Sequence, residues 1–188
     1  MPRLTTPFLA PGSMSGRPQP EIAGDGLLLR PWSPADLDAV LTGYADPGIQ
    51  RWHTRSMDDD EARAWIAGWP GRWRAETGAG WAVTAGGHVA GQISLRRVHL
   101  DEGLADISYW VLPAARGRQL APRALAALTR WCFDELGLHR IEVQHSTANP
   151  ASCRVAERAG FPAEGTKVSE ALHTDGWHDM HLHARIRP

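Results

Sequence analysis

A run of basic residues at 116–123 is the part of the sequence best suited to chemistry. It contains Arg116, Arg118 and Arg123 together with Gly117. The residues before it alternate as in a strand and those after it repeat as in a helix, so it should be a loop that leads into a helix. Such a junction exposes unpaired N–H groups at the positive end of the helix dipole, which favours phosphate. The run predicts either a phosphate site or a solvated basic helix start, and the residues favour the two interpretations equally. It matches neither a P-loop nor a dinucleotide fingerprint.

Histidines near the end of the chain form a second candidate group. His178, His181 and His183 follow one another closely, and His173 precedes them. On a strand, His181 and His183 share one face, whereas His178 points to the other. No cysteine and no HExxH pattern joins them. We therefore expect no metal site.

Short strands and helices must position these residues. The first is a strand at 27–30, and Ser33 with Pro34 then starts a helix. A second helix starts at the acidic residues 58–61, and Pro70 is expected to end it. The remaining expected elements are strands at 81–84, 89–95 and 106–111, a helix at 120–136, a strand at 141–145, a helix at 151–159 and strands at 163–169 and 178–186.

The order of these elements predicts one mixed α/β domain over residues 26–188. We expect a central, twisted, mostly antiparallel sheet of six to seven strands with about four helices on its faces. Residues 1–25 are rich in Pro, Gly, Ser and Thr and have no periodicity. They should form an extended arm, or a segment foreign to the natural chain.

Composition limits the classes of function. The 188 residues include 20 basic and 21 acidic side chains, and the net charge of −1 removes the electrostatic case for nucleic acid or an anionic membrane as partner. No run approaches the ~20 apolar residues of a membrane span, and no secretory signal is recognisable. Two cysteines, Cys132 and Cys153, are too few for a disulfide framework. We expect a reduced, cytoplasmic protein.

Three blocks of sequence resemble one known family. Residues 116–121 (RGRQLA) match the frame Arg/Gln-x-x-Gly-x-Gly/Ala, and residues 149–161 follow Asn-x-x-Ser-x-x-Val-x-Glu-x-x-Gly-Phe. A closing DGWHD block lies at 175–179. In order and spacing the blocks resemble the GCN5-related N-acetyltransferases (GNAT), in the branch similar to the ribosomal-protein N-terminal acetyltransferases. The resemblance covers about residues 26–186 and implies the GNAT fold.

The resemblance also implies acetyl-CoA as co-substrate. Its pantetheine arm would pair with the strand that ends at Val111, whose N–H would polarise the thioester carbonyl. The loop would hold the pyrophosphate. Gln119 replaces the family's central glycine, which lets the backbone approach the phosphates closely, and its side-chain amide could compensate. The implied cofactor-binding residues are Val111, Arg116, Gly117, Arg118, Gln119, Leu120, Ala121, Asn149 and Ser152.

Catalytic roles follow from the same resemblance. Ser152 matches a hydroxyl near the sulfur and is the candidate acid for the departing thiolate, although serine is also common in a first helical turn. Asp106 is a candidate base or a binder of the acceptor's ammonium group, and His145 is a second candidate base with a better matched pKa. Cys153 cannot point the same way as Ser152 on a helix, and is interpreted as a small buried residue.

Tryptophans predict the acceptor side. Of nine tryptophans, four lie between Trp52 and Trp73. Trp65 should be core, whereas Trp52 and Trp69 should line the acceptor site and bind an amine by cation–π contact. The resemblance places His53 and Arg55 in the same region, and Asp106 is a further candidate for acceptor binding.

The sequence thus predicts an N-acetyltransferase that works by direct attack in a ternary complex. The acceptor is a protein N-terminal α-amine or a small-molecule amine. Two alternatives stay open: a non-catalytic module that binds acyl-CoA or a partner, and an enzyme that uses another donor such as succinyl-CoA. We expect no metal, and a homodimer is left open.

Overall fold

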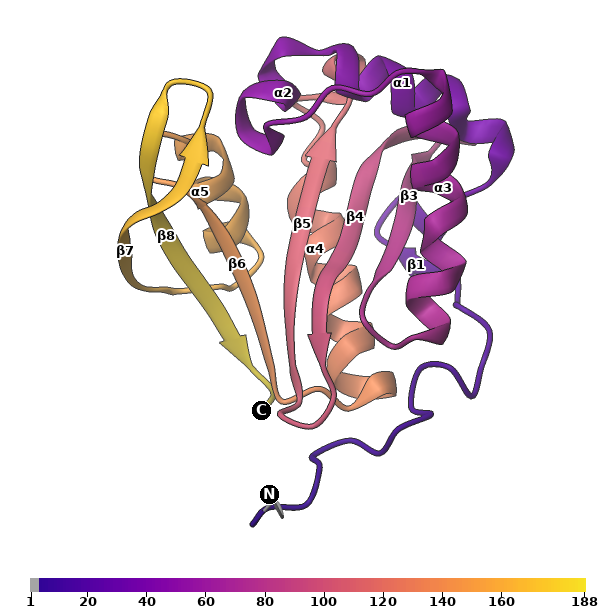
Figure 1. The fold of residues 1–188 in the computed structure, drawn as a ribbon, viewed down its shortest axis with the longest axis vertical. Coiled ribbons are helices and arrows are strands. Elements are labelled where there is room, and N and C mark those ends of the chain that lie inside the picture. Colours follow the sequence, from indigo (N-terminus) through magenta and orange to yellow (C-terminus); the bar gives the residue numbers. More distant parts are fainter. Residues whose placement is uncertain (1–3) are drawn as a thin grey trace.

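Eight strands form one sheet in a computed structural model of the chain, which describes residues 4–188. Their order across the sheet is β1-β2-β3-β4-β5-β6-β8-β7. Neighbouring strands are antiparallel, except that β5 and β6 are parallel (Figure 1). The strands are β1 (Ile22–Gly24), β2 (Leu27–Pro31), β3 (Ala79–Ala85), β4 (His88–His99), β5 (Leu104–Val111), β6 (Arg140–Ser146), β7 (Ala163–His173) and β8 (Gly176–Ile186).

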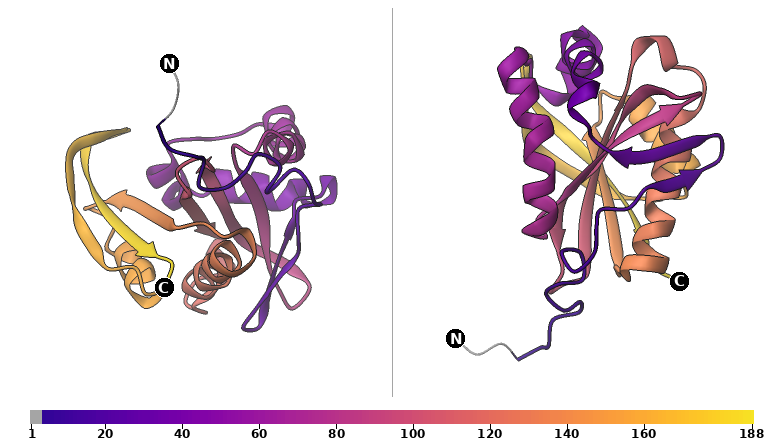
Figure 2. Two further views of the ribbon diagram at one scale, coloured as in Figure 1. Left: turned by 90° about the horizontal axis from the view of Figure 1, so that it is seen from below. Right: turned by 90° about the vertical axis from the view of Figure 1, so that its right-hand side faces the viewer.

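Helices cover both faces of this sheet (Figure 2). The three helices of the N-terminal half, α1 to α3, pack against one face, and α4 and α5 pack against the other. The predicted mixed α/β fold is confirmed, with slightly more strands and helices than expected among the described residues. The helices are α1 (Leu37–Ala45), α2 (Pro47–His53), α3 (Asp59–Arg74), α4 (Leu120–Trp131), which continues as a π-turn over Cys132–Leu136, and α5 (Pro150–Arg158).

Each face of the sheet has its own hydrophobic core. The larger core lies under α4 and includes Leu29, Trp81, Ile93, Leu125 and Leu128, all with no exposed surface. Burial of such side chains drives folding by about 1.5–3 kcal/mol each. The smaller core, under α1 to α3, is rich in aromatic rings and consists of Trp32, Val40, Tyr44, Ile49, Ala62, Ile66, Trp69, Ala82 and Trp110.

The N-terminal segment packs on the domain more closely than the sequence predicts. Residues 22–24 of the expected arm form β1, which pairs with β2 and supplies the additional strand. Met14 is completely buried, and the Glu76 carboxylate accepts N–H groups from Gly12, Met14 and Ser15 at 2.7–2.9 Å. These contacts are long-range, so local sequence does not reveal them. Residues 1–3 of the predicted arm lie outside the described residues.

Pro70 does not end α3, contrary to expectation, because the helix continues to Arg74. The last turn carries Trp73, whose ring packs edge-on against Trp81 at a centroid distance of 6.4 Å. Burial of this ring offsets the hydrogen bond that the proline cannot donate. Within residues 4–188, no helix combines the length and apolar character needed to cross a bilayer.

Candidate active site

Strands β5 and β6 separate after a short paired stretch, which leaves one edge of β5 open. The two pair only over residues 104–107 of β5 and then diverge (Figure 1). The N–H of Leu112 donates to the carbonyl of Ala90 at 2.9 Å. Alternation along the antiparallel ladder therefore turns the backbone groups of Tyr109 and Val111 away from β4. They face the space between β5 and β6.

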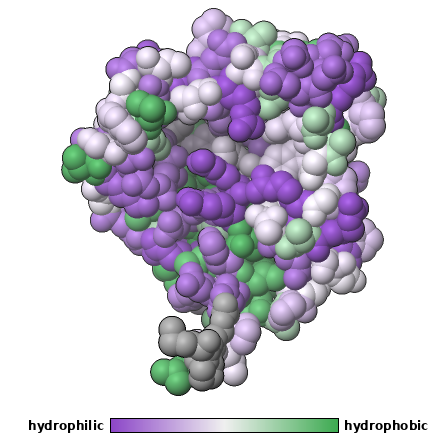
Figure 3. All heavy atoms as spheres, viewed as in Figure 1, coloured by the Kyte–Doolittle hydropathy of each residue, from purple (hydrophilic) through white to green (hydrophobic). Residues whose placement is uncertain are grey.

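Two cavities open at this edge. The larger, of about 490 Å³, lies between residues 115–122 and α5, and we call it the loop cavity. The smaller, of about 340 Å³, lies over the middle of β4 and β5, and we call it the arginine cavity. Figure 3 shows that the face of the molecule seen in Figure 1 is hollowed and largely hydrophilic. The cavities meet at shared lining residues, called the junction: Trp52, His53, Tyr109, Asn149 and Ser152.

The arginines around the loop at 116–121 hold its backbone in place and also give it a positive charge. Arg123 donates to the backbone carbonyls of Gln119 and Arg118, at 3.3 and 2.9 Å. Arg116 donates to Asp46 at 2.5 Å and to the carbonyl of Val111 at 3.3 Å. Arg118 is exposed and does not line the loop cavity. Of the three predicted phosphate ligands, two thus have structural partners already.

Gln119 adopts a backbone conformation that favours glycine. It precedes the first turn of α4 with φ 56° and ψ 25°, in the left-handed region. A non-glycine residue pays about 1 kcal/mol or more there. Its backbone and those of Leu120 and Ala121 border the loop cavity, where the N-terminus of α4 presents unpaired N–H groups. The predicted loop residues therefore lie together at a site suited to an anion.

The first turn of α5 places Ser152 at the junction. Asn149 caps this helix, and its side chain accepts the N–H of Ser152 at 3.1 Å. The Tyr109 hydroxyl donates to the Ser152 carbonyl at 3.3 Å, which ties α5 to the open edge of β5. Burial raises the pKa of Tyr109 to about 12, so its phenol keeps its proton at neutral pH.

The arginine cavity has a strong positive charge. Arg55, Arg72, Arg96 and Arg97 line it, and among its described lining residues Asp106 is the only carboxylate. The field of these cations reaches the junction. Burial, together with Arg96 and Arg55, lowers the pKa of His53 to about 4 although its ring bonds to the Tyr109 carbonyl.

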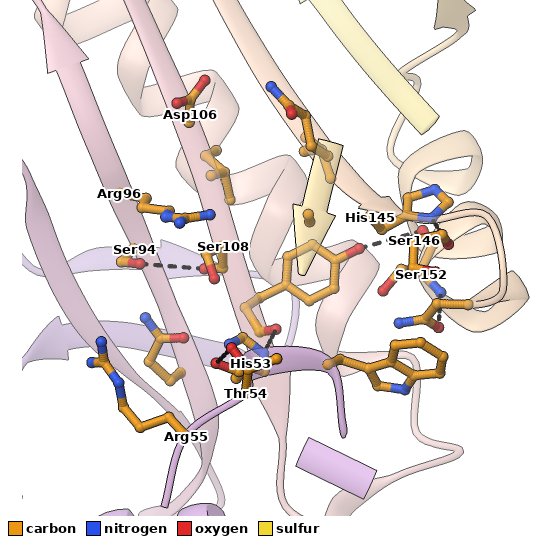
Figure 4. A pocket seen from close by; sticks show the side chains of 18 of the residues that line it. His53, Thr54, Arg55, Ser94, Arg96, Asp106, Ser108, His145, Ser146 and Ser152 are labelled. Atoms are coloured by element: carbon orange, nitrogen blue, oxygen red, sulfur yellow. Dashed lines mark hydrogen bonds between the residues drawn. The ribbon is translucent and has the colours of Figure 1, made fainter. Parts of the chain in front are cut away.

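Two of the four arginines are already engaged. Arg97 donates to Asp106 at 2.5 Å, and Arg72 donates to backbone carbonyls, including that of Arg96. In the described part of the chain, the guanidinium groups of Arg55 and Arg96 have neither a hydrogen bond nor an ion pair. Figure 4 shows the Arg96 side chain lying across the cavity. Two cations are thus free to bind a negative ligand.

The predicted bases lie apart from each other. Asp106 lines the arginine cavity at the end opposite Ser152, while His145 lies beside Ser146 and Ser152 (Figure 4). His145 is buried, and its Nδ1 bonds to the Ser146 carbonyl at 2.9 Å. Burial also lowers its pKa, and its Nε2 has no partner.

The predicted acceptor tryptophans differ in exposure. Trp52 is partly exposed at the junction, and the guanidinium of Arg51 lies over its ring at 4.7 Å. Trp69 is buried and forms part of the cavity floor. Its ring lies so close to Gly80 that a Cβ there would approach it to 2.4 Å, which explains the glycine.

Sequence reasoning missed two residues of the site, Tyr109 and Arg96. Tyr109 lies at the junction, and the sequence indicates only that it is one position of a strand. Arg96 lines the arginine cavity together with Arg55, and the two arginines come together only through the packing of distant elements. Cys153, expected to be buried, is partly exposed.

Comparison with known proteins identifies the domain. Residues 26–162 match the model of the acetyltransferase (GNAT) domain. The ribosomal-protein-serine acetyltransferase of Escherichia coli is 32% identical over 96 residues, which are 51% of this chain and 54% of that protein. The N-acetyltransferase YoaA of Bacillus subtilis, itself uncharacterized, is 22% identical over 174 residues, 90% of this chain and 98% of YoaA. The relatives at 32–33% identity are matched over only about half of their own length.

Solved structures share the fold. RimL, a ribosomal L7/L12 α-N-protein acetyltransferase solved with coenzyme A, has a TM-score of 0.82 and 22% identity over 89% of this chain and 98% of RimL. RimJ of Mycobacterium smegmatis, solved with a CoA disulfide, has a TM-score of 0.78 and 25% identity over 89% of this chain and 86% of RimJ.

Proposed function

Because the chain belongs to the acetyltransferase (GNAT) family, we propose that it transfers an acetyl group from acetyl-CoA to a primary amine in a ternary complex. The observation that carries the proposal is the meeting of the two cavities at the junction. One cavity suits an anionic cofactor arm and the other a polar acceptor. Direct transfer requires both ligands to reach one point.

The residues present fit coenzyme A. The open edge of β5 offers the N–H groups of Tyr109 and Val111 to an extended pantetheine arm, as in strand addition, while their carbonyls already accept from His53 and Arg116. The N-terminus of α4 and the arginines Arg154 and Arg158, which line the loop cavity, complement phosphates. Acetyl-CoA would supply the acetyl group as an activated thioester. RimL and RimJ were solved with forms of coenzyme A, which supports the assignment.

Residues at the junction would handle charge and protons. The N–H of Val111 points into the space between β5 and β6 and would stabilise a developing oxyanion. Ser152 would give its hydroxyl proton to the departing thiolate. Tyr109 would position Ser152 through its hydrogen bond. We assign Asp106 to acceptor binding rather than to proton transfer, because it lies in the arginine cavity at the end opposite Ser152 (Figure 4) and its carboxylate is ion-paired with Arg97.

The charge of the arginine cavity favours an α-amine over a lysine side chain. An α-amine has a pKa near 8 and a lysine amine near 10.4. Nearby cations disfavour an ammonium ion and lower its pKa further. An α-amine in this cavity would therefore lose its proton to water at neutral pH without a strong base. This agrees with His53 being neutral and His145 being buried.

The unpaired cations Arg55 and Arg96 favour an acceptor with a carboxylate or phosphate near its amine. We propose a protein N-terminus with an acidic residue among its first positions, and a small acidic amine as the second candidate. The name of the Escherichia coli relative, a ribosomal-protein-serine acetyltransferase, supports the protein acceptor. The same two cations would also suit the carboxylate of succinyl-CoA, which is the second candidate donor.

The test uses peptides that differ by Asp against Asn near the N-terminus, with acetyl-CoA or succinyl-CoA as donor. Thiol release and product mass are followed. A charge-assisted hydrogen bond contributes about 1.5 kcal/mol or more, so kcat/KM should be roughly tenfold higher for the acidic peptide. The double variant Arg55→Gln, Arg96→Gln should remove this preference, while the control Arg63→Gln on α3 should keep it. Coenzyme A binding without any acylated product would contradict the enzyme and favour a binding module.

A further inference from the structure

Four metal-ligating side chains meet beside the junction. His145 of β6, His181 and His183 of β8 and Cys153 of α5 place one ligand atom each within 4.8 Å of the others. The pairing of β6 with β8 sets His145 directly opposite His181. The helix α5 then brings Cys153 over the same face, with its Sγ 3.8 Å from Nε2 of His183. The expectation that no cysteine joins these histidines is therefore wrong.

Backbone carbonyls orient two of the imidazoles. Nδ1 of His145 lies 2.9 Å from the carbonyl of Ser146, and Nδ1 of His183 lies 2.9 Å from the carbonyl of Phe161. A carbonyl can only accept, so each Nδ1 carries the proton and each Nε2 presents a lone pair to the cluster. Metal-bound histidines typically have this arrangement, because the outer hydrogen bond fixes both tautomer and ring direction.

Buried nitrogens of the cluster lack partners. Nε2 of His145 and Nδ1 of His181 are buried without any hydrogen bond, and His145 is only 6% exposed. An unpaired buried polar atom destabilises the fold, because it gives up its hydrogen bonds to water and gains none in return. This unfavourable situation occurs twice, at His145 and at His181, whose rings lie next to each other and close to the Cys153 thiol. A cation at the centre would satisfy both nitrogens at once.

We propose that His145, Cys153, His181 and His183 bind one zinc ion in a closed tetrahedral site. Three imidazoles and one thiolate are ligands that zinc prefers. With bonds of about 2.0–2.3 Å, the donors of such a site lie roughly 3.5 Å apart, so donors now within 4.8 Å of one another need to approach by about 1.3 Å at most. Cys153 is partly exposed and gives the ion an entry path.

The site would be structural rather than catalytic. Four protein ligands fill a tetrahedral zinc and leave no position for water or substrate. The ion would join α5 to the strands β6 and β8, which already pair with each other over residues 140–146 of β6. Because Cys153 follows Ser152 in α5, the ion would also fix the helix turn that carries the junction serine. His145 would then be a ligand and not the general base.

Cobalt is the probe that tests the site. Untagged protein is treated with a chelator, titrated with Co²⁺ and followed by absorption. We expect one ion per chain, visible bands of tetrahedral intensity and a thiolate-to-cobalt charge-transfer band, all removed when Zn²⁺ is added. Zinc at about 100 times its Kd should raise the Tm by roughly 5–10 °C. Wild-type protein without the charge-transfer band would overturn the proposal, whatever the variants do.

Two variants assign the ligands. Cys153→Ser is nearly isosteric and should lose the charge-transfer band and weaken cobalt binding at least tenfold. His88→Ala removes an exposed histidine outside the cluster and should bind as wild type does. A band that persists in Cys153→Ser would assign the thiolate to Cys132 and refute the site. Zinc counted in the protein as purified, by mass spectrometry, gives a readout that needs neither variant nor activity.

Discussion

The partly buried His53 makes the protein sensitive to acid in a defined pH range. Its pKa is lowered to about 4 by burial and by the charges of Arg96 and Arg55. In the unfolded chain the pKa of histidine is about 6.5. Between these values the unfolded state binds the proton and the folded state does not. Unfolding is therefore favoured as the pH falls from 6.5 to 4.

The size of the effect follows from the two pKa values. A difference of about 2.5 pKa units corresponds to roughly 3 kcal/mol, at 1.36 kcal/mol per unit. This contribution to the free energy of unfolding is fully present above pH 6.5 and is lost by pH 4. Carboxylates titrate over part of the same range, so the wild-type curve alone does not isolate His53. The variant His53→Gln, which can still donate to the Tyr109 carbonyl, provides the comparison.

The assay is urea unfolding of both proteins at intervals between pH 7.5 and 4.5. Wild type should lose about 2–3 kcal/mol more than His53→Gln over this range. Arg96→Gln should reduce the loss, because one of the cations that disfavour protonated His53 is gone. Parallel curves for wild type and His53→Gln would refute the reasoning, and with it the strong positive field assigned to the arginine cavity.

Three further predictions concern the loop cavity and the N-terminal segment. Arg154→Glu or Arg158→Glu in the lining of the loop cavity should raise the Kd for coenzyme A roughly tenfold or more by calorimetry, whereas Arg130→Glu at the other end of α4 should not; equal effects of all three would mean that only net charge matters. Gln119→Gly should bind coenzyme A several-fold more tightly, because glycine accepts φ 56° without cost and lets phosphate approach; weaker binding would show that the glutamine amide is a ligand. Glu76→Gln should lower the Tm by about 4–8 °C through lost charge-assisted hydrogen bonds to the N-terminal segment, and an unchanged Tm would contradict the anchoring role.

Local features of the site were predictable from sequence. The succession of a strand, the basic loop at 116–121 and a helix is encoded by neighbouring residues. The structure contains the strand before this loop and the helix that begins within it. The cap at Asn149 is equally local. The turn of about 100° per residue also separates Ser152 from Cys153, as expected for a helix.

Features that depend on register were not predictable. A bulge in β4 between Leu95 and Arg97 changes which side chains of that strand meet β5, and so places Arg96 at the cavity. The histidine cluster needs the pairing of His145 with His181, which are far apart in sequence. Whether a distant residue such as Arg55 is paired or free depends on the whole fold. Local periodicity carries none of this information.

A crystal structure with acetyl-CoA tests the central claim most directly. The pantetheine arm should follow the open edge of β5 at residues 108–111, and the pyrophosphate should lie on the loop at 116–121. The thioester should lie at the junction, with the Ser152 hydroxyl near the sulfur and the N–H of Val111 near the carbonyl oxygen. Coenzyme A bound anywhere else, or with its sulfur outside the junction, would contradict the account.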